Sequence, residues 1–246
     1  MPSVLVIDDE KATLTMFRLF LKAFGYDVLV AEDGNTGLAL FDAQKPPLVF
    51  TDLKMPGIDG FDVLRAIKTA APETEVIVIT GHGDMDLVLR ALNLDATDFI
   101  NKPVSRTALQ TALDRAEHRI RRPEARRCQV AVASAAAGSP TIVSIDGVLD
   151  ASGKAALRGI AQAGDIADCP GVVFEFAPHA SFNGAGLDLF IRLMADLKER
   201  GLPVAICGLC ENFRVVMEMI GVPKTLPFAA TKTAACAAIA AGARNH

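Results

Sequence analysis

The stretch LVFTDLKMPGIDGFDVL, residues Leu48–Leu64, contains the repeating unit on which the fold of the first half of the chain is built. Its apolar start, Leu48–Thr51, predicts a buried β-strand. Asp52 stands where that strand ends, and a helical pattern follows at about 59–70. The stretch therefore predicts a strand that carries a carboxylate at its end before the chain turns into a helix.

Units of the same kind lie on both sides of this stretch. Their strands are too apolar to be half-exposed, so they belong in a parallel sheet covered by helices on both faces. We therefore predict an α/β domain of five βα units. The expected strands are 4–7, 28–30, 48–51, 76–79 and 99–100, and the expected helices are 14–24, 35–43, 59–70, 84–93 and 105–122.

Composition indicates more than one domain. A chain of 246 residues, 51% of them hydrophobic, can bury one large core or two ordinary ones. The net charge of −4 is uneven, because residues 1–104 carry −7, residues 105–127 carry +4 and the remainder carries −1. This break favours a boundary at the basic segment. We predict a first domain at 1–121, a basic linker at 122–127 and a second domain at 128–246.

The second domain also reads as alternating strands and helices. A second, smaller α/β unit is therefore expected after the linker. The expected strands are 129–133, 141–146, 171–176 and 203–207, and the expected helices are 151–163, 184–200, 211–220 and 231–241.

Several classes of location and partner are disfavoured. The N-terminus reaches acidic residues too early for a signal peptide, and no apolar run is long enough for a membrane span. The five cysteines all follow residue 127 and suggest no disulfide framework, so we expect a cytoplasmic protein with no membrane partner. The helix at 211–220 has one basic residue, which is unlike a DNA-recognition helix, and we expect no DNA partner.

Polar residues gather at the predicted strand ends of the first domain. Since chemistry in open parallel sheets lies at the carboxyl ends of the strands, these residues are expected to converge. Converging carboxylates repel one another and call for a hard cation such as Mg²⁺, while a lysine and a hydroxyl would stabilise charge on a transferring phosphoryl group. The residues are Asp8 and Asp9, Asp52, Thr80 and Lys102.

Residues 1 to about 121 resemble the receiver domain of two-component response regulators. The resemblance rests on "VIDDE", "TDLKMPGIDGFDVL", "VIVITGHGD" and "DATDFINKP". It implies a flavodoxin-like, doubly wound parallel sheet, and a histidine kinase or phosphotransfer protein that phosphorylates Asp52. It also implies that Asp9, Asp52 and the backbone carbonyl of Lys54 ligate Mg²⁺ and that Asp8 acts through water. Thr80 and Lys102 would bind the phosphoryl oxygens.

The same resemblance implies roles for residues around the acidic site. Phe99 stands where the family has an aromatic switch residue: phosphorylation would pull Thr80 toward the phosphoryl group and turn Phe99 inward. Lys54 and His82 stand where the family tunes dephosphorylation. Asp95 departs from the family, which often has glycine there. No enzymatic activity is expected beyond self-phosphorylation and autodephosphorylation at Asp52, and a homodimer through the face at 85–115 is plausible.

Residues from about 128 to 241 resemble a STAS domain of the anti-sigma-factor-antagonist type. The resemblance rests on "IVSIDGVLDASGKAAL", "GVVFEFA", "GLPVAICG" and "NFRVVMEMIGVPKTLPF". It implies a protein-binding module whose partner is an anti-sigma factor or a related kinase-like protein.

One stretch of the second domain, SFNGAGLDLF at Ser181–Phe190, departs from that family. The family commonly has a phosphorylated serine where Gly184 stands and a second hydroxyl where Ala185 stands, so serine phosphorylation is impossible there. Asn183 can still cap the helix. Asn183, Gly184, Ala185 and Gly186 can be interpreted as a docking surface that no longer switches by serine phosphorylation. Alternatively, the small residues permit close helix packing, or they form a weakly indicated phosphate cradle.

The sequence therefore predicts a phosphorelay response regulator with a protein-binding STAS output. The alternative is a receiver-gated STAS protein that senses a small ligand, such as a nucleotide or a lipid. A phosphatase is disfavoured because Lys54 stands where a second acid would be needed. Cys207 and Cys210 have the spacing of a redox pair, but Cys207 closes an apolar strand, which favours structural thiols.

Overall fold

The computed structural model describes residues 2–81, 83–133, 138–162, 169–220, 222 and 226–242. The chain divides into two compact units, Met1–Arg122 and Pro123–His246. None of the helices in these described ranges combines the length and the hydropathy that a bilayer crossing requires.

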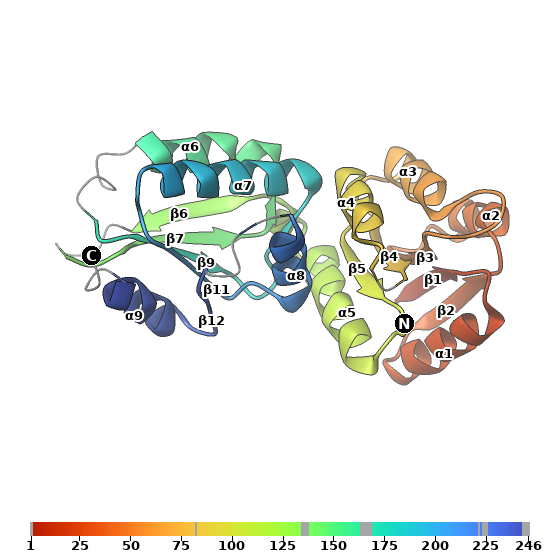
Figure 1. Ribbon diagram of the computed structural model, residues 1–246. Coiled ribbons are helices and arrows are strands. Elements are labelled where there is room, and N and C mark those ends of the chain that lie inside the picture. The colour runs from red at the N-terminus through yellow and green to blue at the C-terminus, as the bar shows by residue number, and fades with distance from the viewer. Residues whose placement is uncertain are drawn as a thin grey trace. The chain divides into compact units, whose positions relative to one another are not determined.

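The first unit is built on a five-stranded parallel sheet with the order β2-β1-β3-β4-β5 (Figure 1). The chain reverses its direction of strand addition between β1 and β3, so the sheet is doubly wound as predicted. The three inner strands are apolar on both sides because helices cover both faces. The strands are β1 (Ser3–Ile7), β2 (Asp27–Ala31), β3 (Leu48–Asp52), β4 (Glu75–Thr80) and β5 (Asp98–Asn101).

Two layers of helices enclose this sheet. The core on one face joins apolar side chains of α1 and α5 to the sheet, with Phe17 of α1 in ring contact with Phe50 of β3. On the other face, α2 packs so closely that a Cβ on its Gly37 would lie 2.4 Å from the Ile7 side chain. The helices are α1 (Lys11–Ala23), α2 (Gly34–Gln44), α3 (Gly60–Ala70), α4 (Met85–Asn93) and α5 (Arg106–Arg121).

Buried charge lies beneath α5. Arg115, 1% exposed, hydrogen-bonds to the carboxylate of Asp98. Arg119 donates to Glu75 at 3.4 Å, and the same carboxylate oxygen accepts from the hydroxyl of Thr97 at 2.6 Å. Such pairs are costly to break because removal of one partner leaves a buried charge uncompensated. They fix α5 against the edge of the sheet formed by β4 and β5.

A further contact holds the opposite edge of the sheet to α5. Tyr26, the residue before β2, donates its phenol hydrogen to Glu117 of α5. Burial and the neighbouring carboxylate raise the pKa of Tyr26, so the phenol stays protonated and remains a donor.

The second unit contains a five-stranded sheet with the order β12-β11-β9-β7-β6. The edge strand β6 runs antiparallel to β7, and the other neighbours pair in parallel. A separate pair, β8 with β10, lies outside this sheet. The strands are β6 (Gln129–Ala133), β7 (Thr141–Asp146), β8 (Val148–Leu149), β9 (Val172–Phe176), β10 (Ser181–Phe182), β11 (Val204–Cys207) and β12 (Phe228–Ala229).

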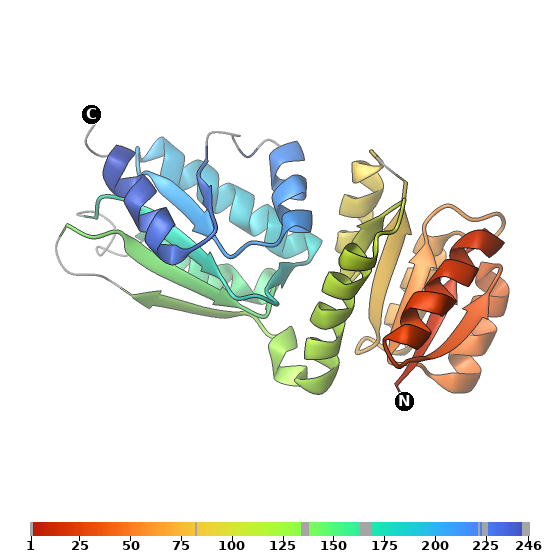
Figure 2. The same ribbon diagram turned by 90° about the horizontal axis from the view of Figure 1, so that it is seen from below.

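Helices lie on both faces of the second sheet, with α6 and α7 on one face and α9 on the other (Figures 1 and 2). The core under α7 is aromatic: the ring of Phe190 contacts the rings of Phe174, Phe176 and Phe182, and Phe182 also contacts Phe213 of α8. The helices are α6 (Lys154–Gln162), α7 (Gly184–Glu199), α8 (Glu211–Met219) and α9 (Lys232–Gly242).

The segment predicted as a basic linker has structure of its own. Pro123–Arg126 form a short 3₁₀ helix. A Cβ on Gly147 would lie 2.1 Å from the backbone oxygen of Arg127 and 2.8 Å from that of Ala125, so this segment packs closely on the turn after β7. Gly147 has φ +77°, a conformation that also favours glycine.

Candidate functional site

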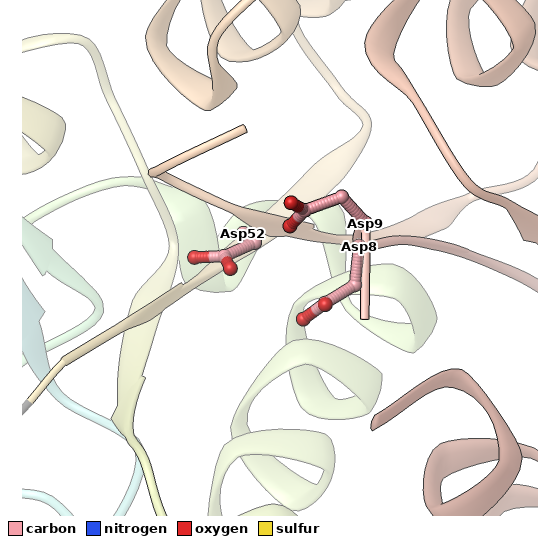
Figure 3. A group of neighbouring side chains, drawn as sticks. All are labelled: Asp8, Asp9 and Asp52. Atoms are coloured by element: carbon pink, nitrogen blue, oxygen red, sulfur yellow. The ribbon is translucent and has the colours of Figure 1, made fainter. Parts of the chain in front are cut away.

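Three carboxylates converge at the carboxyl ends of β1 and β3 (Figure 3). Asp8 and Asp9 follow β1 directly, and Asp52 is the last residue of β3. One oxygen from each lies within 4.8 Å of the others. Asp8 is fully buried and Asp52 is 5% exposed, whereas Asp9 is exposed. The predicted cluster therefore forms, with two oxygens at the bottom of the site and one at its rim.

Lys102 provides the cation of the site from the turn after β5. Its Nζ lies 2.7 Å from Asp52 Oδ2 and 3.1 Å from Asp8 Oδ2. Burial alone would lower the pKa of Lys102, but the hydrogen bonds and charges of Asp52 and Asp8 raise it above its usual value. Burial raises the pKa of Asp8, although Glu10 and Lys102 oppose this. Lys102 is therefore protonated and bridges two of the three carboxylates.

The charges at the site fit a divalent cation. Three carboxylates face one ammonium group, which leaves negative charge that Lys102 alone does not balance. Hard oxygen ligands suit Mg²⁺, which keeps several waters and needs few protein ligands. The residues present therefore fit the predicted cofactor.

Thr80 adds an unused hydroxyl to this edge of the sheet. It ends β4, is 1% exposed, and its Oγ1 has no hydrogen-bond partner within the described residues. Because a buried hydroxyl without a partner is unfavourable, Thr80 is suited to donate to an acceptor that arrives at the site.

Gly60, the first residue of α3, permits the close approach of that helix to Asp52. A Cβ on Gly60 would lie 2.0 Å from the backbone oxygen of Asp52, and the Gly60 N–H bonds to the Leu53 carbonyl at 3.2 Å. The loop after β3 consequently returns to its own strand and fixes the backbone of Asp52.

Of the two residues predicted to tune dephosphorylation, Lys54 and His82, the structure describes Lys54. The Lys54 N–H is 3.3 Å from Asp52 Oδ1, so its peptide lies beside the carboxylate, while its Nζ pairs with Asp84 before α4. His82 lies outside the described residues. Asp95 has φ +61°, which explains why the family often has glycine at this turn.

The structure shows where the predicted switch residue lies. Phe99 was expected to turn inward on phosphorylation, but its ring already lies inside the first unit, where the residue is 1% exposed. Phe99 is in the middle of the buried part of β5 and packs as a core residue. The ring thus already occupies the inward position in this structure, and the role of Phe99 as a switch stays a prediction.

Sequence reasoning missed two residues of the site. Glu10 lies 3.2 Å from Lys102 Nζ, and a hydrogen bond from Thr13 and the charge of Lys102 lower its pKa. Asp84 is the second, as the ion-pair partner of Lys54. Glu10 is adjacent to Asp9, so the acidic run itself was the signal. Asp84 gave none, because 30 residues separate it from Lys54.

The loop of small residues in the second unit lies at the start of α7. Asn183 accepts a hydrogen bond from the Gly186 N–H at 2.9 Å, which confirms the predicted cap. A Cβ on Gly186 would lie 1.7 Å from the backbone oxygen of Leu149. Gly184 is buried as well, and Ala185 is exposed. Close packing thus accounts for Gly186, and within this loop only the side chain of Ala185 is exposed.

All five cysteines are free thiols. Burial raises the pKa of Cys207, which ends β11, so this thiol is a poor nucleophile.

Known proteins resemble the first unit. The family model described as a response regulator receiver domain matches residues 4–114. The transcriptional regulatory protein GlrR of Escherichia coli is 34% identical over 111 residues, which are 45% of this chain and 25% of that protein. The tetrathionate response regulatory protein TtrR of Salmonella typhimurium is 34% identical over 116 residues, 47% of this chain and 56% of that protein.

Among solved structures, a receiver domain protein from Clostridium thermocellum is 36% identical and has a TM-score of 0.48. The match covers 49% of this chain and 98% of that one. The chain spans between a quarter and just over half of the length of the two curated relatives.

Proposed function

Residues 4–114 belong to the response regulator receiver family, and from this premise we propose that Asp52 accepts a phosphoryl group and thereby controls a protein-binding second unit. The observation that carries the proposal is the convergence at one edge of the sheet of three carboxylates, Lys102 and the Thr80 hydroxyl, which has no partner in the described part of the chain. The donor is a histidine kinase or a phosphotransfer protein, as a receiver domain implies.

Each group has a defined part in the transfer. A carboxylate oxygen of Asp52 attacks phosphorus, an O–P bond forms, and the P–N bond of the donor phosphohistidine breaks with its electron pair returning to nitrogen. Lys102 is placed to neutralise charge on the phosphoryl oxygens, and Thr80 is placed to donate a hydrogen bond to one of them. Asp8, Asp9 and Asp52 would hold Mg²⁺, which supplies further charge neutralisation when bound.

Hydrolysis of the aspartyl phosphate restores the carboxylate. A water oxygen bonds to phosphorus, the O–P bond to Asp52 breaks, and inorganic phosphate leaves while the proton of the water passes to solvent. We propose no other reaction for this chain. Its output would be a change in binding, and the free thiols are compatible with a reducing, cytoplasmic setting.

The output that we propose is a STAS-type docking module. Its support is an α/β sheet with one antiparallel edge strand, together with the sequence resemblance. Gly184 carries no hydroxyl, and Ser181 near it is fully buried, so the helix start offers no accessible serine within this loop. Control of docking would therefore depend on phosphorylation of Asp52 and not of a serine at the start of α7. The partner would be an anti-sigma factor or a kinase-like protein.

GlrR, which is named as a transcriptional regulatory protein, matches 45% of this chain over only 25% of its own length, so its output is not transferred to this chain. The described part of the second unit gives little support for DNA binding. Arg214, the basic residue of α8, pairs with both Glu211 and Glu218, so its charge is already balanced. DNA recognition needs cations that are free to meet phosphates.

A second candidate function is the sensing of a small ligand, and a cavity of about 460 Å³ favours it. The cavity lies at the carboxyl ends of β7 and β9, where α/β sheets often bind ligands. Asp146 and Glu175 line it, and no lysine or arginine is among its lining residues. Lys232 pairs with Glu175 at 2.7 Å, so the negative charge of the lining comes mainly from Asp146. This charge disfavours a nucleotide phosphate and favours an uncharged or cationic ligand.

An affinity pull-down with full-length protein would test the main proposal. Beryllofluoride with Mg²⁺ mimics the phosphoryl group, and Asp52→Asn is the matched control. We expect a protein partner that is captured in one state only, with the difference abolished in the variant. Identical captures in both states would contradict phosphorylation-gated docking and leave ligand sensing as the better account.

A further inference from the structure

The ion pair between Lys54 and Asp84 joins the phosphoacceptor loop to the start of α4. Lys54 Nζ lies 2.8 Å from Asp84 Oδ2 and 2.9 Å from Oδ1, so both carboxylate oxygens are engaged. Lys54 follows Asp52 by two residues, and Asp84 is the N-cap residue of α4. The pair therefore crosses the top of the sheet from β3 to the helix that follows β4.

Asp84 does not perform the task for which its position suits it. An N-cap aspartate normally accepts a hydrogen bond from a backbone N–H of the first turn, which stabilises the helix. Asp84 makes no such cap bond. Its carboxylate instead folds over Gly81, where an added Cβ would lie 2.8 Å from Asp84 Oδ2. The first turn of α4 thus lacks a side-chain cap while Lys54 holds the carboxylate.

Asp52 is a second acidic group beside Lys54. Its N–H already lies 3.3 Å from Asp52 Oδ1, so the flexible side chain starts beside the phosphoacceptor. A phosphoryl group on Asp52 would carry more negative charge than the single carboxylate of Asp84. Because the Lys54 side chain is 63% exposed, its pair with Asp84 is weak and easily exchanged.

We propose that Lys54 and Asp84 form an exchangeable latch. When phosphate or its mimic occupies Asp52, the Lys54 ammonium leaves Asp84 for the phosphoryl oxygens, and Asp84 turns to cap α4. Binding at β3 thereby stabilises the first turn of α4 without any rotation of Phe99. This inference rests on the proposed function of Asp52, and it makes Asp84 a positioning residue for that reaction.

Three variants of the full-length protein separate the latch from a merely structural pair. Asp84→Asn removes the competing charge, so Lys54 should bind the mimic better, and the beryllofluoride affinity in Mg²⁺ should rise about two- to fivefold. Lys54→Met should lower that affinity by a similar factor. The double variant should behave as Lys54→Met does, because Asp84 acts only through Lys54. ¹⁹F NMR measures these affinities directly.

Hydrogen exchange gives the second readout. Both single variants free residue 84 to cap, since Asn caps as well as Asp does, so both should slow amide exchange in the first turn of α4 before the mimic is added. In the original chain this slowing should appear only with the mimic. Asp62→Asn, which breaks the comparable surface pair with Arg65, should change neither readout.

The outcomes are distinguishable. If Asp84→Asn binds beryllofluoride as the original chain does, or more weakly, the latch is wrong while the proposed function stands. If the original chain binds no beryllofluoride in Mg²⁺, the proposed function itself is wrong. Opposite affinity changes in the two single variants, with equal protection of α4, would establish the latch.

Discussion

The first turns of α3 and α7 each pack a glycine against backbone at the end of a strand, β3 for one and β8 for the other, and the chemistry around the two contacts differs. In the first unit, Gly60 allows α3 to approach the backbone of Asp52, and charged groups surround the point of approach. In the second, Gly186 allows α7 to approach Leu149, and the adjoining side chains are an amide, hydrogens and a methyl group. Close packing of a helix start on a strand end therefore occurs in both units, and reactivity depends on which side chains converge there.

The largest expected effect concerns Asp52, whose backbone α3 approaches through Gly60. Asp52→Asn should abolish phosphorylation by acetyl phosphate, because the only nucleophilic oxygen of the proposed reaction is replaced by an amide. Phosphate-affinity gel electrophoresis of the full chain measures the modified fraction. Asp42→Asn, which breaks an exposed pair with Lys45, is the control and should be phosphorylated normally. Residual phosphorylation of the Asp52 variant would place the acceptor elsewhere.

A core substitution in one unit should destabilise that unit and leave the other protected. Arg115→Met leaves Asp98 buried without its cation and should cost about 3–5 kcal/mol of unfolding free energy. Phe190→Ala removes the centre of the aromatic cluster and should cost about the same. Hydrogen exchange by mass spectrometry on the full chain should show loss of amide protection in the first unit for Arg115→Met and in the second unit for Phe190→Ala.

A second substitution checks the cause in the first unit. If the uncompensated charge is the reason, Asp98→Asn combined with Arg115→Met should regain part of the lost stability. No recovery in the double variant would mean that packing of the arginine side chain, and not its charge, stabilises α5.

Substitution of Gly60 and of Gly186 compares the two close helix contacts directly. Gly60→Ala and Gly186→Ala should each cost about 2–4 kcal/mol, because the new Cβ would meet backbone that cannot yield easily. Only Gly60→Ala should also weaken beryllofluoride binding, since it displaces Asp52. Gly159 in α6 has nothing within 4 Å of an added Cβ, so Gly159→Ala should stabilise by about 0.5–1 kcal/mol.

The smallest effect concerns an ion pair at the second sheet. A hydrogen bond from Lys232, 2.7 Å away, lowers the pKa of Glu175 in the folded state. The stabilisation is therefore present above the ordinary pKa of a glutamate and is lost as pH falls through the lowered value. Between neutral and acidic pH, the melting temperature of Glu175→Gln should fall slightly less than that of the original chain. The difference should be small because Lys232 is half exposed. An unchanged pH profile would contradict this linkage.

The sequence predicted the regular elements of both units because their signals are local. Apolar runs and helical spacing place β3, α7 and α8 to within a residue or two. Two-residue strands such as β8 and β10 were missed, since they are too short to show a period. They form only because the turn after β7 and the segment before α7 are brought side by side by the rest of the fold.

The site was predictable where strand ends determine it. Asp8, Asp52 and Lys102 converge because parallel strands bring their carboxyl ends to one edge. The pair of Lys54 with Asp84 depends on the conformations of two loops, for which the sequence has no periodic signal. The burial of Phe99 depends on what packs around β5, which a position in a motif does not specify.

The contact between Tyr26 and Glu117 gives this protein an optical property. The chain has one tyrosine and no tryptophan, so its near-ultraviolet emission comes from a single phenol. A carboxylate that accepts the phenol hydrogen quenches that emission in general. Any event that pulls α5 from the sheet edge at Tyr26 should therefore brighten the protein, and its movement can be followed in real time without a label.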